Sequence, residues 1–330
     1  IRQYQPDIII TRFPRDARAG HGHHSASAII ANEAFIAAAD PTQFPEHFKY
    51  GVGPWQAKRI LWNTFNFGSV NTTNENQLKL EVGAYNPIIG KSYGEIGAEA
   101  RTMHKSQGEG RPRRRGASYE YFDLTGGEPA KNDIMDGVNT TWARLQGATI
   151  ETSIDKIIAT YNINDPAASV PALVTLYQQI NALPVSNWRA YKLSEVQSII
   201  KDCAGLFVEA TTQVQQAVPE QKLAVDFFIN QRTAVASKLV SVHFPTKDTL
   251  LNKAFLSNQN IQIPYTLVVP SNAAISQPYW LVQPKTEGMF VVKDQQLIGK
   301  AENDPVFEVT VKIEIENQPF DFTLPRSEEH

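Results

Sequence analysis

Residues 6–40 read PDIIITRFPRDARAGHGHHSASAIIANEAFIAAAD, and the fold of the first part of the chain follows from this stretch. Residues 8–10 are three consecutive isoleucines behind Pro6, which predicts a short buried strand. Residues 12–22 alternate charged side chains with Gly and Pro, which predicts a loop. Residues 26–39 are almost entirely Ala, Ile and Phe, and this composition predicts a helix that packs against a sheet.

The predicted loop is a candidate site because it follows the carboxyl end of a strand, where open α/β sheets bind their ligands. Three histidines end it, directly before a helix that Ser25 is expected to cap. His24 therefore lies at or just before a helix N-terminus, where the positive end of the dipole disfavours imidazolium and favours a neutral ring at pH 7. A neutral imidazole is the form that binds a divalent metal, so His24 is a candidate metal ligand.

His21 and His24 are three residues apart, but in a loop this spacing does not place them on one face. The metal interpretation is therefore stronger for one of them than for both. Two alternatives are a solvated His-rich loop and the remnant of an expression tag. The internal position of the cluster, between a predicted core strand and a predicted core helix, argues against a tag.

The segment GHGHHSASA, after a strand that runs into Arg-Phe-Pro and before an Ala-rich helix, resembles the second conserved block of the LmbE-like, or PIG-L, N-acetylglucosamine deacetylases. The segments SYGEIGAEARTMHKSQGEG and RGASYEYFDLTGG also resemble a large secreted branch of this family that is common in Bacteroidetes. The resemblance covers about residues 1–145. It implies a Rossmann-like α/β fold, a Zn²⁺ cofactor, removal of acetyl groups from amino sugars, and a periplasmic or secreted location.

The second block of the family usually reads His-Pro-Asp-His. The resemblance makes His24 a zinc ligand and His21 the residue that assists the transition state, with Gly22 and His23 in place of Pro-Asp. The first block of the family, Ala-His-Pro-Asp-Asp-Glu, supplies the other His and Asp ligands and the general base, and nothing in this chain matches it. We therefore expect the chain to be the C-terminal portion of a longer protein, whose N-terminal segment is a partner that completes the site.

Some members of the family carry a Tyr two residues before the first His, where this chain has Ala19. The role of that Tyr is then vacant, or it is filled by Arg12, Arg18 or a residue farther along. Whether Asp16 substitutes for a ligand is open, as is whether His23 faces the metal. The predicted substrate-binding residues are Arg12, Asp16, Arg18, Arg101 and His104.

Arg101 and His104 come from a second predicted helix, which begins at the capping box Ser92-Tyr-Gly-Glu and runs to about Ser106. Helical spacing predicts burial of Tyr93, Ile96, Ala100 and Met103, and a cationic stripe of Arg101, His104 and Lys105 on a neighbouring face. A loop with arginines at positions 111, 113, 114 and 115 follows. These arginines either contact an anionic substrate group, such as a uronate or phosphate, or form plain surface.

Composition places the chain among globular proteins, with 330 residues, 42% hydrophobic and 20% charged. That length is enough for two or three domains with real cores. A net charge of −3 gives no general attraction to nucleic acid or to an anionic membrane. No apolar run approaches the roughly 20 residues of a spanning helix, so we expect no transmembrane segment. Cys203 is the single cysteine, which excludes an internal disulfide and a CxxC metal site.

Three regions of different pattern follow one another along the sequence. Residues 1–150 are predicted as the C-terminal part of the deacetylase domain, residues 151–235 as a helical bundle, and residues 236–330 as an immunoglobulin-like β-sandwich. The expected sandwich strands include PYWLV and MFVVKD. Aromatic rings suit the apolar faces of sugars, so Trp55, Trp62, Tyr279 and Trp280 either contact glycan or pack in cores. The alternative function is a non-catalytic carbohydrate-binding or scaffold protein.

Overall fold

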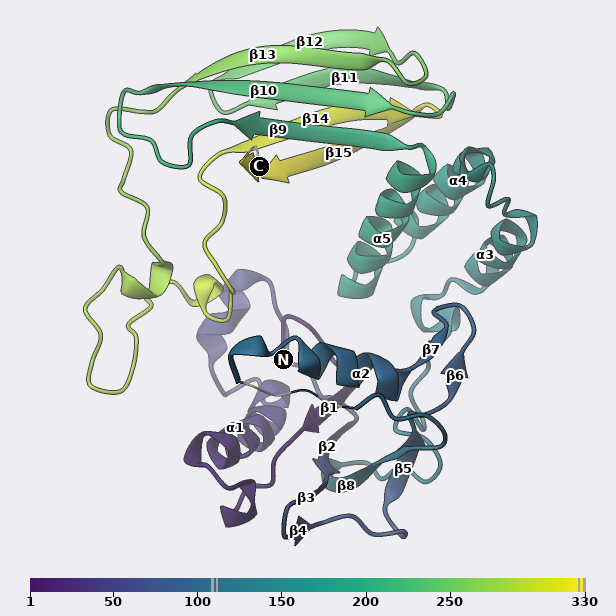
Figure 1. The fold of residues 1–330 in the computed structure, drawn as a ribbon, viewed down its shortest axis with the longest axis vertical. Coiled ribbons are helices and arrows are strands. Elements are labelled where there is room, and N and C mark those ends of the chain that lie inside the picture. Colours follow the sequence, from purple (N-terminus) through teal and green to yellow (C-terminus); the bar gives the residue numbers. More distant parts are fainter. Residues whose placement is uncertain (108–109, 111, 326, 329–330) are drawn as a thin grey trace. The chain divides into compact units, whose positions relative to one another are not determined.

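A computed structural model of the chain describes residues 1–107, 110, 112–325 and 327–328 (Figure 1). The chain divides into two compact units, residues 1–140 and residues 141–330. The structure contains both α-helices and several β-sheets, as expected for a chain that combines helices and strands.

The first unit is built on a four-stranded sheet with the order β1-β2-β8-β5. Its strands are β1 (Ile8–Thr11), β2 (Arg59–Thr64), β8 (Tyr119–Gly127) and β5 (Leu78–Glu81). β1 and β2 are parallel, whereas β8 is antiparallel to both of its neighbours. The strand expected at residues 8–10 is present as β1. The parallel pair is connected through helix α1 (Gly22–Ala39), so this part is a β-α-β unit.

Helix α1 begins earlier than expected, because its N-cap residue is His21. The prediction that Ser25 caps the helix is wrong: Ser25 lies inside the first turn and its hydroxyl donates to the carbonyl of Gly22 at 3.1 Å. The buried side of α1 carries Ala28, Asn32, Phe35 and Ala38, which recur every three to four residues. Phe35 forms a small core with Ala57 and Ile60, so only one side of this apolar helix is covered by the sheet.

The C-terminal end of α1 is fixed by a buried arginine from the start of the chain. The guanidinium of Arg2 donates hydrogen bonds of 2.7–3.1 Å to five carbonyl groups, at Ala37, Ala38, Asp40, Gln43 and Phe44. Carbonyls at a helix C-terminus have no partner within the helix and carry the negative end of its dipole. Arg2 therefore satisfies carbonyls at this end and in the turn that follows it.

Helix α2 (Tyr93–Thr102) starts at the expected capping box. The Ser92 hydroxyl accepts from the Glu95 N–H, and the Glu95 carboxylate accepts from the Ser92 N–H. The predicted burial is wrong: Tyr93, Ile96, Ala100 and Met103 are exposed, and the helix ends before Ser106. The capping box determines where this helix starts, but it does not determine which of its side chains are buried.

Two small ribbons complete the first unit. They are formed by β3 (Asn66–Phe67) with β4 (Val70–Asn71), and by β6 (Tyr85–Asn86) with β7 (Lys91–Ser92).

The second unit combines three helices with two four-stranded sheets. The helices are α3 (Ala148–Thr160), α4 (Val170–Asn181) and α5 (Asn187–Cys203). One sheet has the order β13 (Asn260–Val268), β10 (Lys222–Gln231), β9 (Leu206–Thr212) and β16 (Ser327–Glu328). The other has the order β12 (Lys247–Ala254), β11 (Ser237–Phe244), β14 (Glu308–Ile315) and β15 (Gln318–Pro325).

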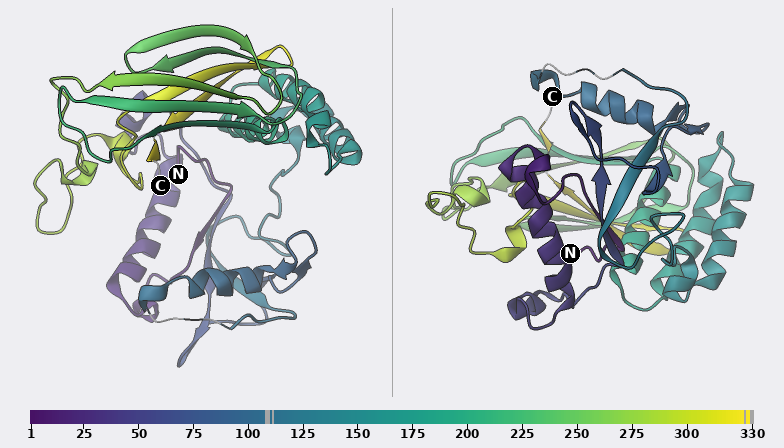
Figure 2. Two further views of the ribbon diagram at one scale, coloured as in Figure 1. Left: turned by 45° about the horizontal axis from the view of Figure 1, so that its top comes forward. Right: turned by 90° about the horizontal axis from the view of Figure 1, so that it is seen from below.

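Both sheets and the helices share one apolar core. Phe227 of one sheet and Val311 of the other are buried in it, and so are Ile180 and Ile200 of the helices. Figure 2 shows the two sheets stacked face to face.

Two sequence predictions for this unit are wrong. The helical bundle expected over residues 151–235 ends at Cys203, because Gly205 takes a left-handed conformation (φ +60°) and the strands β9 and β10 follow. PYWLV contains a short 3-10 helix, Tyr279–Leu281, and MFVVKD forms no strand. Both of these runs are short and lie close to Pro or Gly, which break strands.

Within the described part of the chain, no helix has both the length and the apolar composition needed to cross a bilayer.

Candidate functional site

The predicted loop lies at the carboxyl ends of the parallel strands β1 and β2. The last register pair of these strands is Thr11 with Trp62, so the residues that follow each strand meet at one edge of the sheet. The loop contains a short 3-10 helix, Ala17–Ala19, and then enters α1. This is the position at which α/β sheets place their ligands.

His24 lies in the first turn of α1 and its ring is held from two directions. Its Nδ1 atom is 3.0 Å from the carbonyl oxygen of Ala19. Its ring stacks on Phe13, with 3.7 Å between ring centroids and 4° between planes. A carbonyl only accepts hydrogen bonds, so Nδ1 must donate and carry the proton. In the neutral ring the lone pair is then on Nε2, the arrangement found in metal-binding histidines whose other nitrogen donates to a carbonyl.

His21 is the N-cap residue of α1 and is exposed. Its ring stands edge-on to that of His24, with 5.1 Å between centroids and a right angle between planes. The spacing of His21 and His24 in the sequence did not decide whether their side chains lie together, and the structure shows that they do. His23, between them in sequence, is exposed in the first turn of the helix.

Asp16 and Arg18 form an ion pair in the loop that leads to the histidines. The Asp16 carboxylate accepts from the side chain of Arg18 at 2.7–3.2 Å and also from its backbone N–H at 3.0 Å. These hydrogen bonds, chiefly those from the Arg18 side chain, lower the pKa of Asp16 to about 2. The Arg18 guanidinium lies over the ring of Trp62, 5.1 Å from its centroid. Trp62 is buried, which favours packing over sugar stacking for this residue.

Arg12 forms a second polar group at the same edge. It donates to the side-chain oxygen of Asn63 and lies 3.6 Å from the carboxylate of Glu120. Asn63 in turn donates to Glu120 at 2.8 Å. Arg12 and Arg18 are thus each paired with an acidic side chain, and both remain half-exposed.

Arg101 and His104, the other predicted substrate residues, belong to a different element. Arg101 lies in the last turn of α2, and His104 is exposed just beyond it. The side-chain contacts found for His24 within the described residues join it to Phe13, Ala19 and His21, not to α2.

The arginine-rich loop after α2 lies partly outside the described residues, since Arg111 is not among them. Arg113 pairs with Glu99 at 3.1 Å, and Arg115 pairs with Glu95 at 2.9 Å. These pairs hold the loop to α2 and favour the surface interpretation for both side chains.

Among the described residues, the site supplies one oriented candidate zinc ligand, His24. Zinc in proteins takes three or four N, O or S ligands, and the described residues contain no group of three His, Cys, Asp or Glu placed to hold a metal. The hydrogen bond to Ala19 favours the tautomer of a ligand for His24, and the ring of His21 contacts that of His24. Asp16 is paired with Arg18, so its contacts do not support a role as a metal ligand.

Sequence reasoning missed Phe13, which orients His24, and Asn63, which binds Arg12. Phe13 follows β1 directly in RFPRD, and Asn63 is next to the last residue of β2. Both residues lie at or near the ends of β1 and β2. Because neighbouring parallel strands end at the same edge of a sheet, the sequence could have placed both residues at the site.

Comparisons with known proteins place the chain in no family. No family model matches it, and no curated protein matches its sequence. Among solved structures, a partial likeness is found to the Pseudomonas fluorescens alkylpurine DNA glycosylase AlkC bound to DNA containing an abasic site analog. The two chains are 10% identical, the match covers 58% of this chain and 56% of the glycosylase chain, and the TM-score is 0.18. A likeness of this size carries no conclusion about fold or function.

Proposed function

We propose that this chain carries part of the active site of a zinc-dependent hydrolase that removes N-acetyl groups from amino sugars or related glycans. The observation that supports it most strongly is the hydrogen bond from His24 Nδ1 to the Ala19 carbonyl, because it directs the Nε2 lone pair away from the backbone. The sequence resemblance to N-acetylglucosamine deacetylases identifies the same His24 as a zinc ligand.

Zinc supplies the chemistry that amide hydrolysis needs at neutral pH: it lowers the pKa of a bound water from 15.7 towards about 7 and polarises the carbonyl. His24 would hold one position on the metal. His21 is exposed and its ring contacts that of His24, which supports a role in which it would stabilise the oxyanion or give a proton to the leaving amine. Such a general acid contributes roughly 10²–10⁴-fold to the rate.

The remaining ligands and the general base come, in this proposal, from residues outside the described set, because the described residues bring no third donor to His24. The isolated chain is therefore expected to be a poor enzyme or none.

The polar groups beside the histidines are the proposed substrate contacts. Arg12 and Arg18 are half-exposed and keep guanidinium N–H groups at the same edge as His24. Arginine binds carboxylate and phosphate groups through paired hydrogen bonds, so an acidic or phosphorylated amino sugar suits this edge. Arg101 and His104, at the end of α2, are proposed as contacts for a more distant part of a glycan.

The finer fold and the location are part of the same proposal. The parallel β1-α1-β2 unit supports a Rossmann-like first domain, and two packed sheets, antiparallel except for the β9-β16 pair, support an immunoglobulin-like module in the second unit. Such modules accompany secreted enzymes that act on carbohydrates, which supports a periplasmic or secreted location.

The test is acetate release from N-acetylglucosamine oligosaccharides by the protein expressed at the full length of its gene, with and without Zn²⁺. We expect zinc-dependent release that His24→Ala abolishes and His23→Ala preserves. No release from any N-acetylated sugar, or release that His24→Ala leaves unchanged, would refute the proposal. Release by the 330-residue chain alone would refute the claim that further ligands lie outside it.

A further inference from the structure

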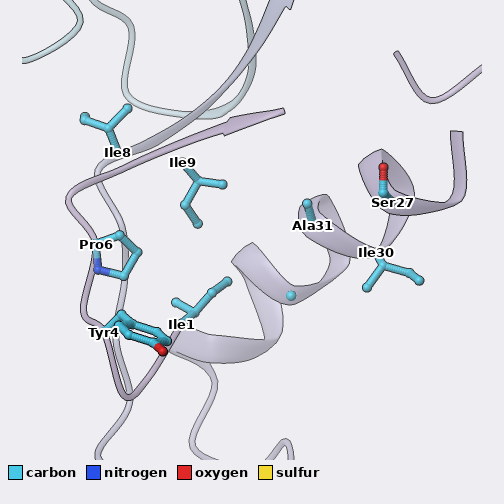
Figure 3. A pocket seen from close by; sticks show the side chains of 9 residues that line it. Ile1, Tyr4, Pro6, Ile8, Ile9, Ser27, Ile30 and Ala31 are labelled. Carbon is cyan, nitrogen blue, oxygen red and sulfur yellow. The ribbon is translucent and has the colours of Figure 1, made fainter. Parts of the chain in front are cut away.

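An apolar groove of about 580 Å³ lies along β1 and α1 (Figure 3). Its walls are mainly aliphatic, with Ile8 and Ile9 on the strand and Ile30 on the helix. The one serine that lines it, Ser27, donates its hydroxyl to the carbonyl of His24 at 2.8 Å. No serine among these lining residues is thus paired with a base, whereas the second unit holds a Ser, a His and an Asp that are joined by hydrogen bonds.

These three side chains lie on the β11–β12 hairpin of the second unit. The Oγ atom of Ser241 is 3.0 Å from Nε2 of His243, and Nδ1 of His243 is 2.9 Å from Oδ1 of Asp248. An ionised carboxylate only accepts hydrogen bonds, so Nδ1 donates to Asp248. In the neutral ring the lone pair is then on Nε2, which accepts from the Ser241 hydroxyl. This is the arrangement in which a histidine acts as a general base toward a serine.

A β-bulge in β11 turns the serine and the histidine outward. The register of β11 shifts between Leu239 and Ser241 against both of its neighbours, β12 and β14. Because of this shift, Leu239 and Val242 are both fully buried in the core, although they are three residues apart. Ser241 and His243 lie on the other face of the sheet, where the side chain of His243 is 43% exposed. Bulges redirect side chains in this way and are frequent next to active sites.

Lys312 supplies a cation beside Ser241. The two residues are directly opposite each other in the β11–β14 register, so their side chains share one face. The Lys312 Nζ atom is 3.8 Å from a carboxylate oxygen of Asp321, which is longer than a hydrogen bond, and its side chain is 42% exposed. Ser241 is 7% exposed between Lys312 and Leu250, and Leu250 is 74% exposed. The side chains that cover Ser241 therefore border on solvent and can move aside for a small molecule.

We propose that Ser241, His243 and Asp248 form a second active site, which hydrolyses small carboxylic esters and does not depend on zinc. The Ser241 oxygen bonds to the ester carbonyl carbon while its proton passes to Nε2 of His243, and the carbonyl electron pair moves onto the oxygen, next to Lys312. The C–O bond to the alcohol then breaks, the alcohol takes the proton from Nε2, and the acyl group stays on Ser241. Water repeats these steps on the acyl group, which releases the carboxylic acid and restores Ser241. Asp248 acts through His243 and is a positioning residue.

The experiment treats the chain with an alkyl fluorophosphonate in EDTA, locates the label by peptide mass spectrometry, and measures hydrolysis of p-nitrophenyl acetate. A serine expels fluoride from this reagent rapidly when a base takes its proton, so we expect the label on Ser241. His243→Gln should slow labelling at least about 100-fold, the typical contribution of a general base. Asp248→Ala should slow it at least about tenfold and release His243 from the Nδ1–H tautomer in ¹H–¹⁵N NMR. Asp226→Ala, at an exposed aspartate of β10, is the matched control and should change neither.

The outcomes separate this inference from the proposed function because EDTA removes zinc. A wild-type chain that carries no label on Ser241, or a label that His243→Gln acquires at the wild-type rate, would refute the second site. Labelling without hydrolysis of p-nitrophenyl acetate, or hydrolysis that Ser241→Ala leaves unchanged, would refute the esterase. The position of the wild-type label decides the point even where a variant fails to fold.

Discussion

The imidazole of His24 and the ring of Phe13 are stacked at 3.7 Å, nearly parallel, at the point where strand β1 passes into helix α1. Phe13 belongs to the loop after the strand and His24 to the first turn of the helix, so the contact joins the two sides of the loop. Together with the Ala19 carbonyl it fixes both the plane and the tautomer of the ring. A ligand held in advance in this way loses less conformational freedom when it binds a metal.

Phe13→Ala should weaken zinc binding at His24 without unfolding the unit. Residues that orient a metal ligand typically contribute about 10–100-fold to affinity, and we expect a loss towards the lower end of that range. The measurement is a Zn²⁺ titration of the protein expressed at the full length of its gene, followed by the NMR signals of His24. The control is Phe44→Ala, which removes a 53% exposed ring elsewhere in the unit. Equal affinity in the Phe13 variant and the wild type would show that the stack does not position the ligand.

The Asp16 carboxylate should titrate far below an ordinary aspartate. Hydrogen bonds from the Arg18 side chain and backbone lower the pKa of Asp16 from 3.8 to about 2. Because the folded value lies below the unfolded one, this pair stabilises the loop fully above pH 3.8 and ceases to do so as the pH falls through about 2. The pH dependence of the Asp16 carboxyl ¹³C shift measures the pKa directly. Arg18→Gln should raise it towards 3.8, whereas a wild-type midpoint already near 3.8 would contradict the pairing.

Arg2→Met should destabilise the first unit by roughly 2–4 kcal/mol, since it removes a buried charged donor from five carbonyls, of which those of Ala38, Asp40 and Phe44 keep a backbone N–H donor. Arg2 is 6% exposed, so water cannot easily replace the guanidinium. Urea unfolding followed by hydrogen exchange of α1 amides reports on this unit separately from the other. Arg15→Met, at an exposed arginine, is the control and should change little. A similarly small effect for Arg2→Met would show that these carbonyls find other partners.

Gly127→Ala should cost at least about 2 kcal/mol, and more than Gly20→Ala. Both glycines have positive φ, +85° and +79°, so both variants carry backbone strain. At Gly127 a Cβ would also lie 2.4 Å from the carbonyl oxygen of Lys58 and 2.8 Å from the Cα of Arg59, where β8 pairs with β2. At Gly20 the Cβ meets open space, and about 1 kcal/mol is expected from strain alone. Equal thermal stability of the two variants would contradict the close approach of β8 to β2.

Much of the first unit could be predicted from its sequence, because its signals are local. Three isoleucines in a row, a Gly- and Pro-rich loop and an Ala-rich segment define β1, the loop and α1 without reference to distant residues. The capping box of α2 is also local and is confirmed. Burial of the apolar residues of α2 is not local, since it depends on what packs against the helix, and that prediction was wrong.

The end of α5 shows a second limit. The composition of the residues after Cys203 is compatible with both a helix and a strand. Apolar residues alternate along this segment as in a strand, but this pattern indicates a strand only once Gly205 has ended the helix. At the site, the position of His24 at the start of α1 was predicted from sequence. Its contact with Phe13 and that of Arg12 with Asn63 were not, because they join residues through the sheet edge and the loop rather than through sequence spacing.

The central claim is that His24 is a metal ligand through Nε2, and long-range ¹H–¹⁵N NMR of the seven histidines tests it most directly. We expect His24 to be in the Nδ1–H tautomer at neutral pH. In the protein expressed at the full length of its gene, added ZnCl₂ should shift its Nε2 resonance before those of the other imidazoles. His24→Ala should remove that response and His23→Ala should retain it. A His24 ring protonated on Nε2, or one that zinc leaves unchanged while exposed histidines respond, would contradict the account.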